Sequence, residues 1–188
     1  MEPFVIKREE TGWIEVVCGS MFSGKTEELI RRIRRAEIAR QQVEIFKPAF
    51  DMRYAETEVV SHNRTSIPSV VVVSAAEILQ KAGNAQVIGI DEAHFFDNDL
   101  PRVCVALARK GRRVIIAGLD QDYLAQPFEQ MAQLMALAEY VTKLHAICVV
   151  CGAPANHSQR IVASNERLLL GEKDAYEPRC RHCFEWPD

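Results

Sequence analysis

The chain has 188 residues, of which 48% are hydrophobic and 26% are charged, and its formal net charge at pH 7 is −3. This composition is typical of an ordinary soluble protein with one domain, or one domain and a small appendage. The mild acidity argues against nucleic acid as the main partner. Residues 1–12 have no apolar core of signal-peptide length, and no run approaches the length of a membrane span. A cytoplasmic protein is therefore expected.

The first predicted elements enclose a glycine-rich loop. The apolar run at 13–18 contains a predicted buried strand at 13–17, and a helical pattern begins at Glu27. Between them lies a segment that fits the phosphate-binding pattern G-x-x-x-x-G-K-[ST] without a mismatch: Gly19, Ser20, Met21, Phe22, Ser23, Gly24, Lys25 and Thr26. In such a loop backbone N–H groups cradle phosphate oxygens, the lysine reaches the β- and γ-phosphates, and the hydroxyl holds Mg²⁺. The loop predicts binding of a nucleoside triphosphate with Mg²⁺.

The helix after this loop has an apolar and a basic side. Leu29, Ile33 and Ala36 recur at helical spacing and predict an inward stripe. Four arginines are expected on a solvated face, with an anion-binding patch as the alternative: Arg31, Arg32, Arg34 and Arg35.

Strands and helices alternate along the rest of the chain. Strands are expected at residues 43–46, 69–73, 87–90, 114–118 and 140–147, and helices at 75–82, at 98–110 and from Pro127. Residues 49–68 have no periodicity and predict a long loop or a weak hairpin. The alternation predicts an α/β fold, in which helices cover both faces of a mostly parallel sheet.

The strand at 87–90 leads directly into Asp91 and Glu92. Beside a phosphate-binding loop, a carboxylate at a strand end is placed to hold Mg²⁺ opposite Thr26, so Asp91 is the candidate. Glu92 is then the candidate for general base. The tetrad Asp91-Glu92-Ala93-His94 also spells a helicase signature, but helicase motors need two tandem motor domains and this chain has room for one.

Four of the six cysteines form two C-x-x-C pairs, Cys148 with Cys151 and Cys180 with Cys183. In a cytoplasmic chain, two such pairs are typical of a tetrahedral zinc site, and four thiolates leave no open position, which indicates a structural metal. A redox pair or unrelated buried thiols is the alternative. Cys18 and Cys104 lie in apolar patterns and are expected in the core.

Taken in order, the motifs resemble the type II thymidine kinases, the zinc-containing family, over roughly residues 13–183. The resemblance rests on the glycine-rich loop, on the two C-x-x-C pairs and on the segments Asp51-Met52-Arg53-Tyr54, Asp91-Glu92-Ala93-His94-Phe95-Phe96, Gly118-Leu119-Asp120-Gln121-Asp122-Tyr123 and Pro127-Phe128. It implies a P-loop (RecA-like) domain at 1–144 and a small zinc-binding subdomain with a lasso-like lid at 145–188.

The resemblance also implies an activity: transfer of the γ-phosphoryl group of ATP to the 5′-hydroxyl of thymidine, and commonly of deoxyuridine, giving dTMP and ADP. Glu92 resembles the catalytic base, Lys25 is the phosphate-binding lysine, and Arg53 resembles the arginine that neutralises the transferring phosphoryl group. Asp51 resembles the residue that partners this arginine near the Mg²⁺. A homotetramer and feedback inhibition by dTTP are expected on the same grounds.

The positions that wall the nucleoside pocket in this family match Met21, Phe95, Leu119, Tyr123, Phe128, Leu169 and Tyr176. Leu169 and Tyr176 belong to the lasso between the cysteine pairs. Two departures stand out: His94 replaces the family's usual Gln and is able to charge near neutral pH, and the segment 124–126 is less polar than its counterpart. Two other functions stay open, namely another P-loop phosphotransferase or ATPase, and a zinc-stabilised nucleic-acid-binding module.

Overall fold

A computed structural model describes residues 11–49, 58–60, 66–163 and 174–186. Its centre is a six-stranded sheet of order β5-β2-β6-β7-β1-β8, in which every neighbouring pair of strands is parallel. The strands are β1 (Trp13–Gly19), β2 (Val43–Pro48), β5 (Val70–Val72), β6 (Val87–Ile90), β7 (Arg113–Gly118) and β8 (Tyr140–Leu144). The predicted α/β fold with a parallel sheet is confirmed.

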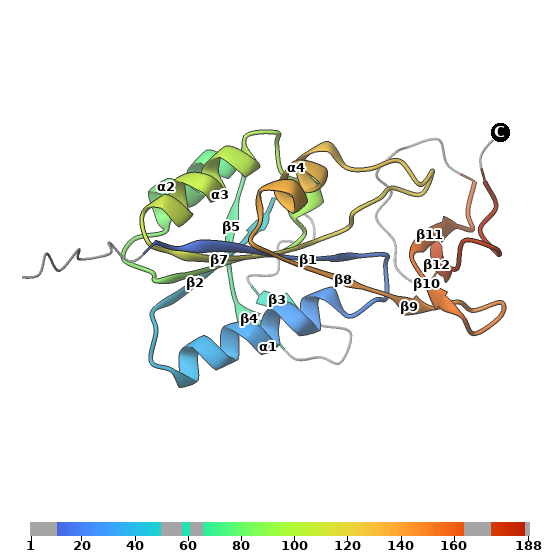
Figure 1. Ribbon diagram of the computed structural model, residues 1–188, viewed down its shortest axis with the longest axis horizontal. Coiled ribbons are helices and arrows are strands. Elements are labelled where there is room, and N and C mark those ends of the chain that lie inside the picture. Colours follow the sequence, from blue (N-terminus) through green and yellow to red (C-terminus); the bar gives the residue numbers. More distant parts are fainter. Residues whose placement is uncertain (1–10, 50–57, 61–65, 164–173, 187–188) are drawn as a thin grey trace, which may run out of the picture.

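Helices cover both faces of this sheet (Figure 1). Helix α1 (Lys25–Ile38) lies on one face, and α2 (Ala75–Lys81), α3 (Leu100–Arg109) and α4 (Glu129–Leu137) lie on the other. Successive side chains of a strand point to opposite faces of the sheet, so each strand contributes residues to the core on both faces. In β1, Val17 packs in the core under α1, whereas Val16 and Cys18 pack under the three helices of the opposite face.

Two predicted elements differ in detail. The expected strand at 140–147 ends at Leu144, and β9 (Ala146–Ile147) leaves the sheet to pair with β10 (Pro154–Ala155). The segment at 49–68 contains a hairpin, because β3 (Glu58–Val60) pairs antiparallel with β4 (Ser66–Pro68). A weak hairpin was one of the two predicted alternatives.

The four arginines of α1 differ in their exposure to solvent, which the sequence did not predict. Arg31, Arg34 and Arg35 are exposed, as predicted, but the side chain of Arg32 is only 12% exposed. Its Nη1 lies 2.8 Å from Oε2 of Glu15 on β1, and the buried Glu15 carboxylate also forms an ion pair with Arg113. The prediction of a uniformly solvated face was wrong here, because a buried carboxylate on the sheet needs cationic partners.

Beyond the carboxyl end of β1 lies a small all-β unit (Figure 1). It combines the β9–β10 hairpin with an antiparallel pair formed by β11 (His157–Arg160) and β12 (Tyr176–Arg179). Because parallel strands share one carboxyl edge, the loops after β1, β6 and β7 meet at the same edge, which is where ligands bind in open α/β sheets.

Candidate active site and metal centre

The loop from Gly19 to Thr26 joins β1 directly to the first turn of α1. Gly19 has a φ of 145°, and a Cβ there would lie 2.2 Å from the carbonyl oxygen of Leu144. Gly24 caps the helix in the left-handed region, with a φ of 84°. Two glycines are therefore required by the backbone itself, and the positive end of the helix faces the loop.

Lys25 folds back onto this loop. Its Nζ donates a hydrogen bond to the carbonyl oxygen of Ser20 at 2.7 Å. Burial of the ammonium lowers the pKa of Lys25, and the nearby carboxylates of Glu92 and Asp91 oppose that shift. The lysine is thus a cation held inside the loop by negative neighbours, where an incoming phosphate would meet it.

Thr26 and Asp91 face each other across the edge of the sheet. The Thr26 hydroxyl donates to the Asp91 carboxylate, with Oγ1 3.3 Å from Oδ2. Burial, reinforced by the charge of Glu92, raises the pKa of Asp91. A hydroxyl and a carboxylate beside a phosphate-binding loop are the oxygen ligands that Mg²⁺ prefers, so these two residues fit that cation.

Glu92 follows Asp91 in a strained conformation. Its backbone lies in the left-handed region, with φ 50° and ψ 40°, which is uncommon for a residue other than glycine. The Glu92 N–H donates to Asp91 Oδ1 at 3.0 Å, and the Glu92 side chain is 50% exposed. This turn places a half-exposed carboxylate beside the Thr26–Asp91 pair.

His94 lies on the 3₁₀ turn η2 (Ala93–Phe95), directly after Glu92. Burial, with a smaller contribution from the positive charge of Lys25, lowers the pKa of His94 to about 3. The expectation that this histidine can charge near neutral pH was wrong, because its side chain is only 1% exposed and an imidazolium would be poorly solvated there.

Aromatic side chains expected around a nucleoside gather near this histidine. The rings of Phe95 and Phe128 lie 4.1 Å and 5.1 Å from the His94 ring, measured between centroids. The backbone N–H of Leu119 donates to His94. These three predicted pocket residues are therefore brought together with His94 on one side of the site.

Arg160 on β11 joins two further predicted pocket residues, and sequence reasoning missed it. Its guanidinium carbon lies 3.5 Å from the centroid of the Tyr123 ring, and its Nη2 donates to the hydroxyl of Tyr176 at 2.7 Å. Arg160 is buried. No local pattern marked it, because the strand that carries it is short and only tertiary pairing brings it to the site.

The segment 120–127 is a turn closed by Asp122. Its Oδ1 accepts hydrogen bonds from the backbone N–H groups of Leu124 and Gln126, both at 2.9 Å. A backbone bridge between Gln121 and Pro127 closes the same turn. The unusual composition of 124–126 is thus accommodated by backbone hydrogen bonds that need no polar side chains at those positions.

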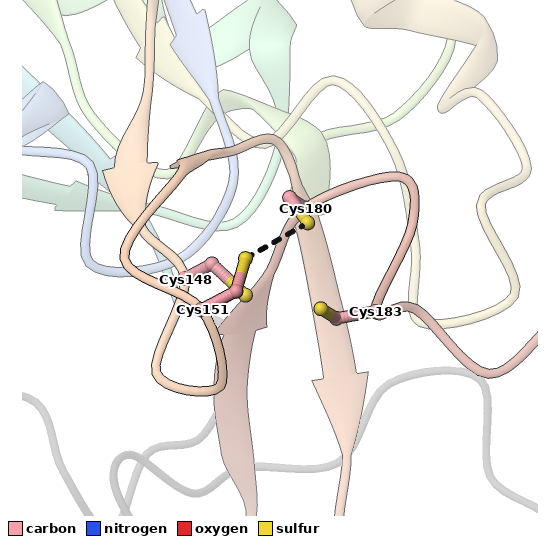
Figure 2. A group of neighbouring side chains, drawn as sticks. All are labelled: Cys148, Cys151, Cys180 and Cys183. Carbon is pink, nitrogen blue, oxygen red and sulfur yellow. Dashed lines mark hydrogen bonds between the residues drawn. The ribbon is translucent and has the colours of Figure 1, made fainter.

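The four cysteines of the two C-x-x-C pairs converge in the small all-β unit (Figure 2). Cys148 and Cys151 flank the turn between β9 and β10, and Cys180 and Cys183 follow β12. Their Sγ atoms all lie within 4.8 Å of one another, and those of Cys151 and Cys180 are 3.6 Å apart. Thiolates bound to one zinc ion at about 2.3 Å would be separated by about 3.8 Å, so the group could hold such a metal.

This cysteine cluster is connected to the phosphate-binding loop. The hydroxyl of Ser20 donates to the carbonyl oxygen of Ala155 at 3.3 Å, and the backbone N–H of Met21 donates to the hydroxyl of Ser158 at 3.0 Å. Phe22 packs against the cluster that contains Cys148 and Cys180. Three consecutive loop residues therefore contact the unit that carries the cysteines.

Three predicted site residues lie outside the described part of the chain: Asp51, Arg53 and Leu169. Within the described part, no helix has the length and apolar character that crossing a membrane requires.

The sequence is similar to known proteins over its whole length. The family model described as thymidine kinase matches residues 12–184. A thymidine kinase from Rhodothermus sp. (strain ITI 518) is 62% identical over 188 residues, which cover 100% of this chain and 88% of the relative. A thymidine kinase from Bacteroides thetaiotaomicron is 55% identical over 97% of this chain and 92% of its own. A thymidine kinase from Porphyromonas gingivalis is 56% identical over 92% of this chain and 85% of the relative.

Proposed function

The chain belongs to the thymidine kinase family, and on that premise we propose that it transfers the γ-phosphoryl group of ATP to the 5′-hydroxyl of thymidine. The products are dTMP and ADP. The observation that carries the proposal is the position of Glu92, whose half-exposed carboxylate stands beside the Thr26–Asp91 pair at the end of a phosphate-binding loop. Glu92 could activate either a water or a hydroxyl, so the aromatic side chains near it favour a nucleoside acceptor, because a simple ATPase does not need an aromatic pocket.

The donor side uses the loop residues. Backbone N–H groups of residues 19–26 would surround the phosphates, and Lys25 would exchange its bond to the Ser20 carbonyl for one to a phosphate oxygen. Thr26 and Asp91 would hold Mg²⁺, which neutralises charge on the β- and γ-phosphates when bound. Catalysis then depends mainly on positioning and electrostatic stabilisation, because a loose phosphoryl transition state needs little early proton abstraction.

On the acceptor side, Glu92 acts as the general base for the 5′-hydroxyl. Tyr123, Phe128 and Tyr176 would enclose the nucleoside with Phe95, Leu119, Met21 and Leu169. The buried Arg160 supports this assignment, because it fixes Tyr123 and Tyr176 relative to each other. Arg53 and Asp51 keep their predicted roles at the transferring phosphoryl group and near the Mg²⁺.

The metal of the four cysteines is proposed to be structural Zn²⁺. Residues 145–188 would form a subdomain whose lasso folds over the base, while residues 1–144 form the kinase domain. A fixed metal at the foot of the lasso would let it open for substrate without losing its anchor. A homotetramer, inhibition by dTTP, a cytoplasmic location and use of deoxyuridine as a second substrate complete the proposal.

The test is a panel of deoxynucleosides assayed with ATP and Mg²⁺. We expect ADP release that depends on thymidine, with deoxyuridine as a weaker or equal acceptor and purine deoxynucleosides inactive. ADP release without any nucleoside would instead identify an ATPase, and salt-sensitive DNA binding without phosphorylation would identify a nucleic-acid-binding module.

A further inference from the structure

His94 is fixed in place from several sides. Its backbone carbonyl accepts a hydrogen bond from Gln130 Nε2 on α4 at 2.6 Å, and the same amide group donates to the carbonyl of Phe96 at 3.0 Å. Phe95 and Phe128 contact its ring. The imidazole is thus buried with little freedom to rotate, and its two nitrogens have different neighbours.

One ring nitrogen has a defined role as acceptor. The backbone N–H of Leu119 points at His94 Nδ1, at a distance of 3.2 Å. A nitrogen that accepts a hydrogen bond from an N–H carries no proton, so the neutral ring must be protonated at Nε2. Burial, with a smaller contribution from Lys25, lowers the pKa of His94 and keeps the ring neutral, which agrees with this assignment.

The other ring nitrogen faces the base. His94 Nε2 lies 3.6 Å from Glu92 Oε2, which is longer than a hydrogen bond. Hydrogen bonds in active sites are often long before substrate binds and shorten in the complex. Because Glu92 is half exposed, a small rotation of its side chain brings its carboxylate within reach of the Nε2–H.

Building on the proposed function, we infer that His94 is a positioning residue for Glu92. Its neutral Nε2–H donates to one oxygen of the Glu92 carboxylate, and the other oxygen is thereby directed at the substrate hydroxyl. Since Nδ1 is anchored on Leu119, the same ring links the base to a wall of the nucleoside pocket. The ring stays neutral and transfers no proton.

The inference predicts which substitutions the site tolerates. Glutamine offers an amide oxygen for Leu119 and an amide donor for Glu92, so His94→Gln should keep turnover within about fivefold of wild type. Leucine offers neither, and His94→Leu should lower kcat by about tenfold to a hundredfold while KM for ATP changes by less than about twofold. Thermal unfolding and zinc content of both variants serve as controls for folding.

A double-mutant cycle separates positioning from mere packing. If His94 acts through Glu92, His94→Leu should change turnover by less than about threefold in a Glu92→Gln background. An equal loss in both backgrounds, equal damage by leucine and glutamine, or wild-type turnover of His94→Leu would each overturn the inference while thymidine kinase activity stands. Wild-type turnover of Glu92→Gln would overturn the base assignment and this inference together.

A spectroscopic measurement is independent of activity. In protein labelled with ¹⁵N histidine, we expect His94 to show an unprotonated Nδ1 and a protonated Nε2 from about pH 5 to pH 9. The opposite tautomer, or a titration within that range, would contradict the inference even if thymidine proved not to be the substrate. This measurement also decides the matter if His94→Leu fails to fold.

Discussion

The two halves of the site are built in different ways. The proposed phosphate half consists of residues 19–26 and Asp91, and apart from Asp91 it is one continuous segment between β1 and α1. The proposed nucleoside half consists of residues 119–128 together with the strands β9, β10, β11 and β12, and separate segments meet there through Arg160 and the four cysteines. A site formed by continuous backbone has its geometry set locally, whereas a dispersed site depends on side-chain contacts and, here, on the proposed metal.

The residue between the two halves should show the largest effect on turnover. Glu92→Gln removes the base without changing size, and we expect kcat to fall by about 10²- to 10⁴-fold, because general base catalysis contributes that much. KM for ATP should stay within about twofold, since the phosphate half is untouched. Steady-state kinetics with thymidine measure both quantities.

Glu28→Gln is the matched control for this change. Glu28 lies on α1, where it pairs with Arg31 and Arg32 away from the proposed acceptor site. Its turnover should equal that of wild type. If Glu92→Gln lost no more than a few-fold in kcat, another group would have to serve as the base.

Metal removal should separate the two halves. Cys183→Ser takes one thiolate from the cluster, and we expect loss of one zinc per chain and a rise of about tenfold or more in KM for thymidine, because structural zinc sites supply folding energy to the elements that they join. Affinity for an ATP analogue should fall less. Metal analysis, with kinetics and binding on the same preparation, tests this.

Cys104→Ala is the control for the metal experiment. Cys104 is buried in the main core, far along the sequence from the cysteine cluster. This variant should keep its zinc. An equal loss of ATP and thymidine affinity in Cys183→Ser would show that the halves do not behave separately.

A single hydroxyl tests the nucleoside half more finely. Tyr176→Phe removes the acceptor that Arg160 Nη2 contacts, and we expect KM for thymidine to rise by about tenfold, because a hydrogen bond to a charged group is worth about 1.5 kcal/mol. ATP affinity should not change. Tyr140→Phe, on the exposed face of β8, is the matched control, and equal effects on both substrates would count against the assignment.

The smallest effect on activity is expected far from both halves. Glu15 is buried under α1; burial raises its pKa, but hydrogen bonds from Arg113, Trp13 and Arg32 outweigh this, so the net pKa lies below the ordinary 4.5. Glu15→Gln should leave both KM values unchanged and lower the free energy of unfolding by about 1–3 kcal/mol at pH 7.

The pH dependence of this difference has a definite sign. The pKa of Glu15 is lower in the folded state than in the unfolded state. Its contribution to the free energy of unfolding is therefore fully present above the unfolded-state pKa and is lost as the pH falls through the folded-state pKa. The stability advantage of wild type over Glu15→Gln should therefore shrink below about pH 4.5. Denaturant unfolding at several pH values measures it, and a constant difference would contradict the ion-pair explanation.

The phosphate half and the sheet were predictable because their signals are local. The pattern at residues 19–26 specifies both the glycines and the lysine, and strands such as β6 are short apolar runs between turn residues. The two C-x-x-C pairs also predicted that the four cysteines lie together, since the spacing of such thiolates is typical of a metal site. The departure of β9 from the sheet was missed because residues 140–147 are uniformly strand-like and only pairing with β10 separates them.

The remaining misses concern buried polar groups. Arg32 was assigned to solvent because its spacing matched an exposed face, but a carboxylate on a neighbouring strand changes its environment. Arg160 had no sequence signal at all. The charge state of His94 depends on enclosure by Phe95, Phe128 and Leu119, and enclosure is a property of the folded chain.

The bonds from Ser20 and Met21 to the all-β unit bear on how the protein is made. Their partners Ala155 and Ser158 lie 135 and 137 residues later in the chain, so they leave the ribosome long after the loop does. The strand β8, which lies beside β1, is also synthesised late. Domains generally fold from the amino terminus during synthesis. Here the phosphate-binding loop emerges first, but its contacts to Ala155 and Ser158 form only after those late residues have been synthesised. A prematurely released chain should therefore lack a finished nucleotide site, even though the whole phosphate-binding motif is present.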